Sequence, residues 1–153
     1  MRKFFLTLGY SGLFPKAPGT VGTVVSLVMA MFLLQYIAVS TLFMLSLLIC
    51  VFSVKQIDIY EKEVGVHDGS EIVIDELAGM WLALAIASAT ADNYILALMA
   101  FVYFRLFDIL KPSIIGKIDR DVKGGWGVMG DDMVAGLFAG LCTSMTYFLL
   151  FLG

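Results

Sequence analysis

Charge is scarce in this chain. Only 15% of its 153 residues are charged, 60% are hydrophobic, and the mean hydropathy is +0.93. A soluble domain is usually nearer half apolar and a quarter charged, so this composition indicates a membrane protein. The net charge of −3 argues against a nucleic-acid-binding protein, which needs a basic surface. The length predicts one domain, residues 1–153.

Cysteine and histidine are also scarce. Cys50 and Cys142 both lie in apolar runs, where cysteine usually acts as a small hydrophobic residue, so no disulfide framework or cysteine metal motif is predicted. His67 is the only histidine. A single loop histidine is most often structural or solvated, and a role as general acid or base is the alternative.

The N-terminal segment has a short apolar core interrupted by Gly9 and Gly12, with no Ala-x-Ala site after it. We therefore expect it to be retained rather than cleaved as a signal peptide. Residues 1–23 carry three basic residues beside Phe and Leu side chains: Arg2, Lys3 and Lys16 accompany Phe4, Phe5, Leu6 and Leu8. That mixture is typical of a segment lying in the headgroup region of a membrane.

Long apolar runs dominate the rest of the chain. No residue from Ala17 to Val54 is charged, and roughly 20 residues span a bilayer core, so this run is too long for one helix. We predict a hairpin of helices over 21–36 and 40–54, which turns near Gln35. The second helix is expected to continue into water until Gly65 ends it.

Three further helices are predicted over 71–89, 93–110 and 132–152, which gives an all-α integral membrane bundle of about five membrane helices. A turn at Asp92-Asn93 separates the first two. Pro112 ends the 93–110 helix, since proline lacks the N–H that would continue it. In the last helix, Gly136 and Gly140 have the small-xxx-small spacing that lets another helix approach closely.

The basic residues indicate an orientation. All ten Lys and Arg lie in the N-terminal segment, in residues 55–76 or in residues 105–123. With five spans these three places share one side, which the positive-inside rule assigns to the cytoplasm. Every acidic residue except Asp92 lies on the same side. We therefore predict a functional surface there.

Two acidic pairs precede apolar runs. Asp75-Glu76 and Asp131-Asp132 each stand at a predicted helix start, with Gly79 or Gly136 one turn later. Four carboxylates in one place would repel each other strongly unless a cation lies among them. Oxygen ligands without cysteines favour Mg²⁺ or Mn²⁺. Helix capping by the acids is the simpler alternative, but it leaves the second acid of each pair unexplained.

Cationic residues accompany these acids. Arg105, Asp108 and Lys111 share one face of a helix, where Arg105 and Lys111 could hold a phosphate, or Arg105 and Asp108 could form only an ion pair. The glycine-rich stretch 124–130 is predicted as a turn that brings backbone N–H groups to an anion. The sequence Pro-Gly-Thr-Val-Gly-Thr at 18–23 could supply further donors.

In that stretch Thr20 is a candidate N-cap, and Thr20 and Thr23 are candidate phosphate ligands. Lys117, Arg120 and Lys123 are expected on a solvated, headgroup-facing surface. If the chain hydrolyses a phosphate ester, it is not a phosphatase that uses one histidine as nucleophile and a second as acid, because it has a single histidine. No Cys-x5-Arg loop or Asp-x-Asp-x-Thr motif is present either. Metal-activated water is then the expected nucleophile.

With these residues established, the chain resembles the bacterial phosphatidylglycerophosphatase A family. The resemblance covers nearly the whole length and rests on three long motifs in order: SGLFPKAPGTVGT, GVHDGSEIVIDELAGMW and FRLFDILKPSIIGKIDRDVKGGWGVMGDDMVAG. It implies a bundle with one central helix and Mg²⁺-dependent hydrolysis of phosphatidylglycerophosphate to phosphatidylglycerol in the inner membrane. It also implies that the acidic and basic motif residues form the site: Asp75, Glu76, Asp108, Asp131, Asp132, Arg105 and Lys111.

We accordingly predict Asp75, Glu76, Asp131 and Asp132 as Mg²⁺ ligands and Asp75, Asp108 and Asp132 as catalytic residues. The main alternative is a proton- or cation-coupled transporter, because acids near a membrane are typical of ion pathways. Transport sites, however, normally lie near the midplane. A non-enzymatic assembly subunit is a third possibility, but it leaves the acidic pairs without a purpose. The sequence predicts no oligomeric state.

Overall fold

The computed structural model describes residues 1–65 and 69–151, and within these ranges the chain is helical, with no strand. The predicted all-α class is confirmed. Two short pieces, α1 (Arg2–Leu6) and the 3₁₀ helix η1 (Ser11–Leu13), come first. The longer helices come after them in order: α2 (Pro18–Leu33), α3 (Val39–Val64), α4 (Ile74–Ile86), α5 (Tyr94–Leu110), α6 (Ile114–Asp121) and α7 (Gly125–Phe151).

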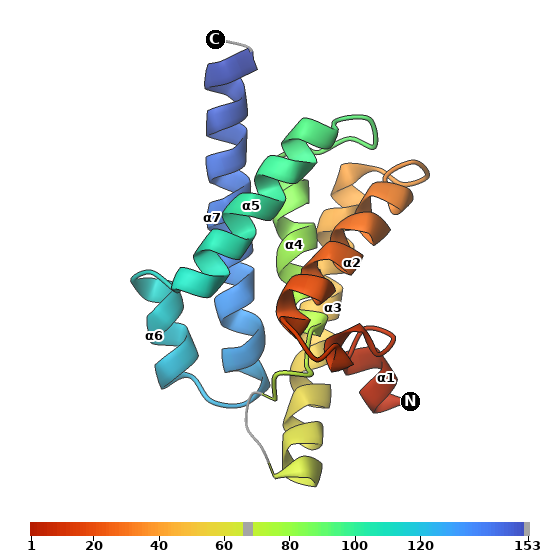
Figure 1. Ribbon diagram of the computed structural model, residues 1–153, viewed down its shortest axis with the longest axis vertical. Helices are drawn as coiled ribbons and strands as arrows, with labels where there is room; N and C mark the ends of the chain where they lie inside the picture. Colours follow the sequence, from red (N-terminus) through yellow and green to blue (C-terminus); the bar gives the residue numbers. More distant parts are fainter. Residues whose placement is uncertain (66–68, 152–153) are drawn as a thin grey trace.

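Helices α2, α3, α4, α5 and α7 run alternately up and down, with the N-terminus near the lower end and the C-terminus at the upper end (Figure 1). Helix α4 packs against α2, α3, α5 and α7. All its residues are buried except Asp75 and Ile86, which are half-buried. Helix α4 is therefore the central helix of the bundle.

Glycines let α7 lie directly against α4, as their spacing predicted. A Cβ atom placed on Gly136 would lie 2.3 Å from the carbonyl oxygen of Gly79, and one on Gly79 would lie 2.6 Å from the carbonyl oxygen of Asp132. One turn further on, a Cβ on Gly140 would meet Ile86 at 2.6 Å. The two backbones touch because no side chain separates them.

Two helices, Val39–Val64 and Gly125–Phe151, are long and apolar enough to cross a membrane by length and composition, and Pro18–Leu33 is a shorter apolar helix. Large apolar side chains cover the outside of the bundle: Leu48 is 65% exposed and Leu149 is 63% exposed. Such a surface suits lipid contact. The count of about five membrane helices stays a prediction.

The helix boundaries agree with the prediction in part. Helix α3 ends at Gly65, whose positive φ of 75° closes it, as predicted. Asn93 caps α5, since its side chain accepts a hydrogen bond from the Leu96 N–H. The expected Thr20 cap is wrong: α2 begins at Pro18 after Ala17, so Thr20 lies inside the first helical turn.

The predicted glycine-rich turn over 124–130 is also wrong, because α7 begins at Gly125 and contains most of that stretch. The Asp58 carboxylate of α3 accepts a hydrogen bond of 2.6 Å from the Gly125 N–H and so caps the new helix. A Cβ on Gly125 would lie 2.2 Å from the carbonyl oxygen of Val54. This glycine therefore serves close packing, and its N–H is already used.

The N-terminal segment is attached to the polar end of the bundle. Leu6 is fully buried, and its carbonyl oxygen accepts a hydrogen bond from the Val73 N–H just before α4. Arg2 pairs with Glu63 at the end of α3, and Lys3 pairs with Glu71. The contacts fix the start of the chain beside the loop that leads into the central helix.

Candidate active site

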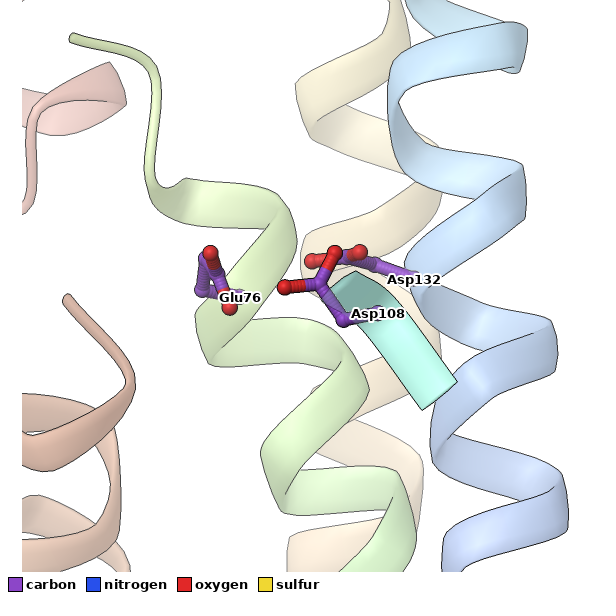
Figure 2. A group of neighbouring side chains, drawn as sticks. All are labelled: Glu76, Asp108 and Asp132. Carbon is purple, nitrogen blue, oxygen red and sulfur yellow. The ribbon is translucent and has the colours of Figure 1, made fainter. Parts of the chain in front are cut away.

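Three carboxylates from three helices meet where α4 begins and α5 ends. Glu76 lies in the first turn of α4, Asp108 in the last turn of α5, and Asp132 in the second turn of α7. One carboxylate oxygen of each lies within 4.8 Å of the others, and the three side chains point toward one another (Figure 2). Glu76 and Asp132 are buried, and Asp108 is half-buried. We call these three residues the acidic cluster.

Arg105 is the cation bound to this cluster. Its Nη1 atom lies 2.8 Å from each carboxylate oxygen of Glu76 and 2.5 Å from Oδ2 of Asp108. The ion pair predicted from the i, i+3 spacing is therefore present, and it extends to a second helix. A single guanidinium holds two of the three acids in place.

Two threonines of α2 complete the surroundings of Arg105. The Thr23 hydroxyl is fully buried and donates a hydrogen bond of 2.6 Å to Oε2 of Glu76. The Thr20 hydroxyl lies 3.3 Å from Nη2 of Arg105. Both were predicted as phosphate ligands; in the structure they support Glu76 and Arg105, and a direct phosphate contact stays a prediction.

Lys111 lies at the edge of the cluster rather than in it. It follows the last residue of α5 with a left-handed φ of 43°, and its Nζ lies 2.7 Å from Oδ2 of Asp131. It also pairs with Asp119 on α6. Partial burial alone would lower the Lys111 pKa, but the hydrogen bonds to Asp119 and Asp131 outweigh it and raise that pKa above its ordinary value. Lys111 is therefore a cation at neutral pH.

Both acidic pairs open onto one cavity of about 260 Å³. Asp108 and Lys111 line the same cavity. The structure thus brings together all of the acids that the sequence singled out. Asp75 and Asp131 line the cavity but are not among the three residues of the acidic cluster. Oδ1 of each accepts a hydrogen bond of 3.0 Å from the next residue's N–H.

The sequence reasoning missed Asp119 as a neighbour of the site. It lies on α6, a helix that was not predicted, in a segment whose basic residues were expected on a solvated, headgroup-facing surface. No sequence pattern points to Asp119, because the contact depends on α6 folding back onto Lys111, where a Cβ on Gly116 would lie 2.6 Å from the Lys111 carbonyl oxygen. His67, the predicted alternative acid or base, lies outside the described residues.

The acidic cluster has the chemistry of a site for a hard divalent cation. Its ligands would all be carboxylate oxygens, which Mg²⁺ prefers. Among the described residues, Oδ2 of Asp132 is a buried atom with no hydrogen-bond partner. Burying a carboxylate without a partner is costly, so a cation would satisfy this atom. The residues present therefore fit a metal ion.

Transport is a poorer fit to this geometry than catalysis. The cluster forms where α4 begins and α5 ends, near the ends of these two helices rather than halfway along them. An ion pathway would normally place its acids near the midplane. A carboxylate cluster with two adjoining cations is suited to bind a divalent cation and a phosphate group.

Comparison with known proteins identifies the family. The family model of phosphatidylglycerophosphatase A matches residues 4–147. A phosphatidylglycerophosphatase A of Haemophilus influenzae is 35% identical over 135 residues, which cover 88% of this chain and 82% of the relative. One of Escherichia coli is 38% identical over 137 residues, covering 88% and 77%. No solved structure matches the chain. The chain belongs to the phosphatidylglycerophosphatase A family.

Proposed function

We propose that this protein removes the terminal phosphate of phosphatidylglycerophosphate, giving phosphatidylglycerol and phosphate, and that the reaction depends on Mg²⁺. The observation that carries the proposal is the acidic cluster of Glu76, Asp108 and Asp132 with Arg105 bound beside it. The names of the two relatives support the choice of substrate.

Glu76, Asp108 and Asp132 would hold the metal ion. When bound, Mg²⁺ would act as a Lewis acid on a phosphoryl oxygen and lower the pKa of a water molecule that attacks phosphorus. The predicted ligand set changes slightly in this proposal, because Asp108 belongs to the cluster whereas Asp75 and Asp131 line the cavity beside it.

The cations of the chain have distinct tasks. Arg105 holds Glu76 and Asp108 in place through Nη1, so its first role is to fix the cluster. Lys111 lines the cavity and stays charged, so it neutralises a phosphate that enters there. Asp75 also lines the cavity and is suited to accept a proton from the attacking water.

The proposed membrane arrangement follows from the same polar end. Helices α2, α3, α4, α5 and α7 would each cross the inner membrane, with the acidic cluster at the cytoplasmic headgroup level. The ten Lys and Arg in the three predicted places support this orientation under the positive-inside rule. A lipid substrate could then keep its acyl chains in the bilayer while its phosphate enters the cavity.

The direct test is phosphate release by the purified protein. Phosphatidylglycerophosphate in detergent micelles is the substrate, first with Mg²⁺ and then with a chelator in excess. We expect release with Mg²⁺, loss with the chelator, and recovery when Mg²⁺ is restored. A transporter or an assembly subunit would release no phosphate under any of these conditions.

A further inference from the structure

An apolar groove of about 550 Å³ lies between α2 and α5, away from the acidic cluster. Its volume is within the range of ligand-binding pockets. Apart from Gln35 and the Tyr94 hydroxyl, the side chains that line it are hydrocarbon or thioether. In Figure 1, α2 and α5 flank the central helix α4. The same two helices carry Thr20, Thr23, Arg105 and Asp108 at their lower ends.

On α2, one face runs from the active site into the groove. Thr20, Val24, Leu27 and Met31 follow each other at spacings of three and four residues, which puts them on one side of a helix. Thr20 touches Arg105 at one end of this face, and Leu27 and Met31 line the groove further along. Val24, between them, is 44% exposed.

On α5, the matching face runs the same way. Arg105, Phe101, Leu98 and Tyr94 share one side of the helix, and Leu98 and Tyr94 line the groove. The Arg105–Thr20 contact lies at one end of these two helix faces, and the groove lies further along both of them.

The length of this face suits a lipid tail. From Arg105 to Tyr94 is 11 residues (105 − 94), or about 16 Å at 1.5 Å per helical residue. Half of a bilayer's hydrocarbon core is about 15 Å. A chain that starts beside Arg105 at the headgroup level would therefore reach into the groove as far as Tyr94.

We infer that the groove between α2 and α5 holds an acyl chain of the lipid whose phosphate enters the acidic cavity, so the enzyme reads chain length as well as headgroup. The inference rests on the proposed function. Val28 and Leu98, on opposite walls, are 63% and 59% exposed, so a lipid chain can reach them from the bilayer.

The test compares two substrates that share the headgroup: dioleoyl and dihexanoyl phosphatidylglycerophosphate in the same detergent micelles. Leu98→Trp and Val28→Trp each fill the groove from one wall. The matched control is Met145→Trp on α7, which is 68% exposed and does not line the groove. The quantity measured is kcat/KM for each substrate, together with the thermal unfolding midpoint to verify folding.

We expect either groove variant to lower kcat/KM for the dioleoyl substrate about 10-fold, the low end of what an apolar pocket discriminates. Activity on the dihexanoyl substrate should stay within about 2-fold, because its chains end before the groove. The control should change neither value. An unchanged ratio in both groove variants, or an equal change in the control, overturns the groove but leaves the phosphatase function standing. No phosphate release by the wild type from either substrate overturns the proposed function and the groove with it.

Discussion

The two acidic pairs have the same local geometry but different electrostatic surroundings. In each pair the first carboxylate accepts the N–H of the second residue at 3.0 Å, and the second residue enters the acidic cluster. Glu76 forms an ion pair with Arg105 and accepts a hydrogen bond from the Thr23 hydroxyl. Asp132 has no such partner at Oδ2 among the described residues.

This difference indicates a division of labour within the cluster. Glu76 is held rigidly, because both of its oxygens are already bound by Arg105. Asp132 is buried with one oxygen available, and a cation would gain most from binding there. We therefore expect loss of the Asp132 carboxylate to weaken metal binding most, and loss of the Glu76 carboxylate to disturb the position of Arg105 and Asp108 as well.

The largest effect is expected for Asp132→Asn. The change keeps the shape of the side chain but removes its charge, so turnover should fall at least about 100-fold, as when another electrostatic group of an active site is removed. Phosphate release in micelles measures it. Asp92→Asn is the control, since Asp92 is exposed on the loop before α5, away from the site. Wild-type turnover by a folded Asp132→Asn protein would contradict the assignment.

The next largest effect is expected for Gly136→Ala, which separates the helices that carry the two pairs. The new methyl group would meet the Gly79 carbonyl oxygen at 2.3 Å, a backbone atom that cannot rotate away. We expect a loss of about 1–3 kcal/mol in stability, typical of overpacking, together with reduced activity. Thermal unfolding and phosphate release measure the two.

Gly130→Ala is the matched control for that substitution. Its methyl group would meet only a side-chain methyl of Ile118, at 3.2 Å, which can shift slightly. If both alanine variants lose activity and stability equally, the close α4–α7 contact is not what holds the pairs together.

A smaller effect is expected for Asp119→Asn, which acts on the Asp131 pair through Lys111. With only Asp131 left as its carboxylate partner, Lys111 is held less firmly at the cavity. We expect KM for the lipid phosphate to rise a few-fold, about 1 kcal/mol, with little change in kcat. Asp121→Asn on the same helix is the control, because Asp121 is exposed. The same rise in KM in a variant that already lacks Lys111 would refute this route.

The smallest effect is expected for a substitution of Glu71. This residue lies just before α4, the helix that carries Asp75 and Glu76, and it forms an ion pair with Lys3 of the N-terminal segment. The Tyr60 hydrogen bond lowers the Glu71 pKa from its ordinary 4.5, and Lys3 adds to this against partial burial. A lowered folded-state pKa stabilises the fold above about pH 4.5, and this contribution is lost as the pH falls through the lower folded value. Glu71→Gln should therefore unfold at a slightly lower temperature than the wild type at pH 7, and the difference should vanish on acidification. A difference that does not shrink as the pH falls below 4.5 would contradict this.

Much of the site was predictable from the sequence, because its residues stand at helix ends and at helical spacing. The Arg105–Asp108 pair follows from one turn of α5, and the close approach of α4 and α7 follows from Gly79 and Gly136. The start of α7 was not predictable in the same way. Its glycines favour a turn by local preference, whereas a distant residue, Asp58 of α3, caps the helix at Gly125.

The pairing of Lys111 with Asp119 could not be predicted from the sequence for a related reason. It depends on α6 folding back after Pro112, a tertiary arrangement made possible by Gly116 packing on the Lys111 carbonyl. The sequence also did not show which acid of each pair enters the acidic cluster. The glycine spacing aligns Asp75 with Asp132, but it is Glu76 that meets Asp132 in the cluster.

The central claim is that the second acid of each pair binds a divalent cation, and Mn²⁺ binding followed by electron paramagnetic resonance tests it most directly. We predict that the purified wild type binds Mn²⁺, that Mg²⁺ competes for the site, and that Asp132→Asn weakens binding at least about 10-fold. Asp131→Asn, beside it in sequence but outside the cluster, should bind nearly as tightly as the wild type. Equal binding by the wild type and Asp132→Asn would contradict the account.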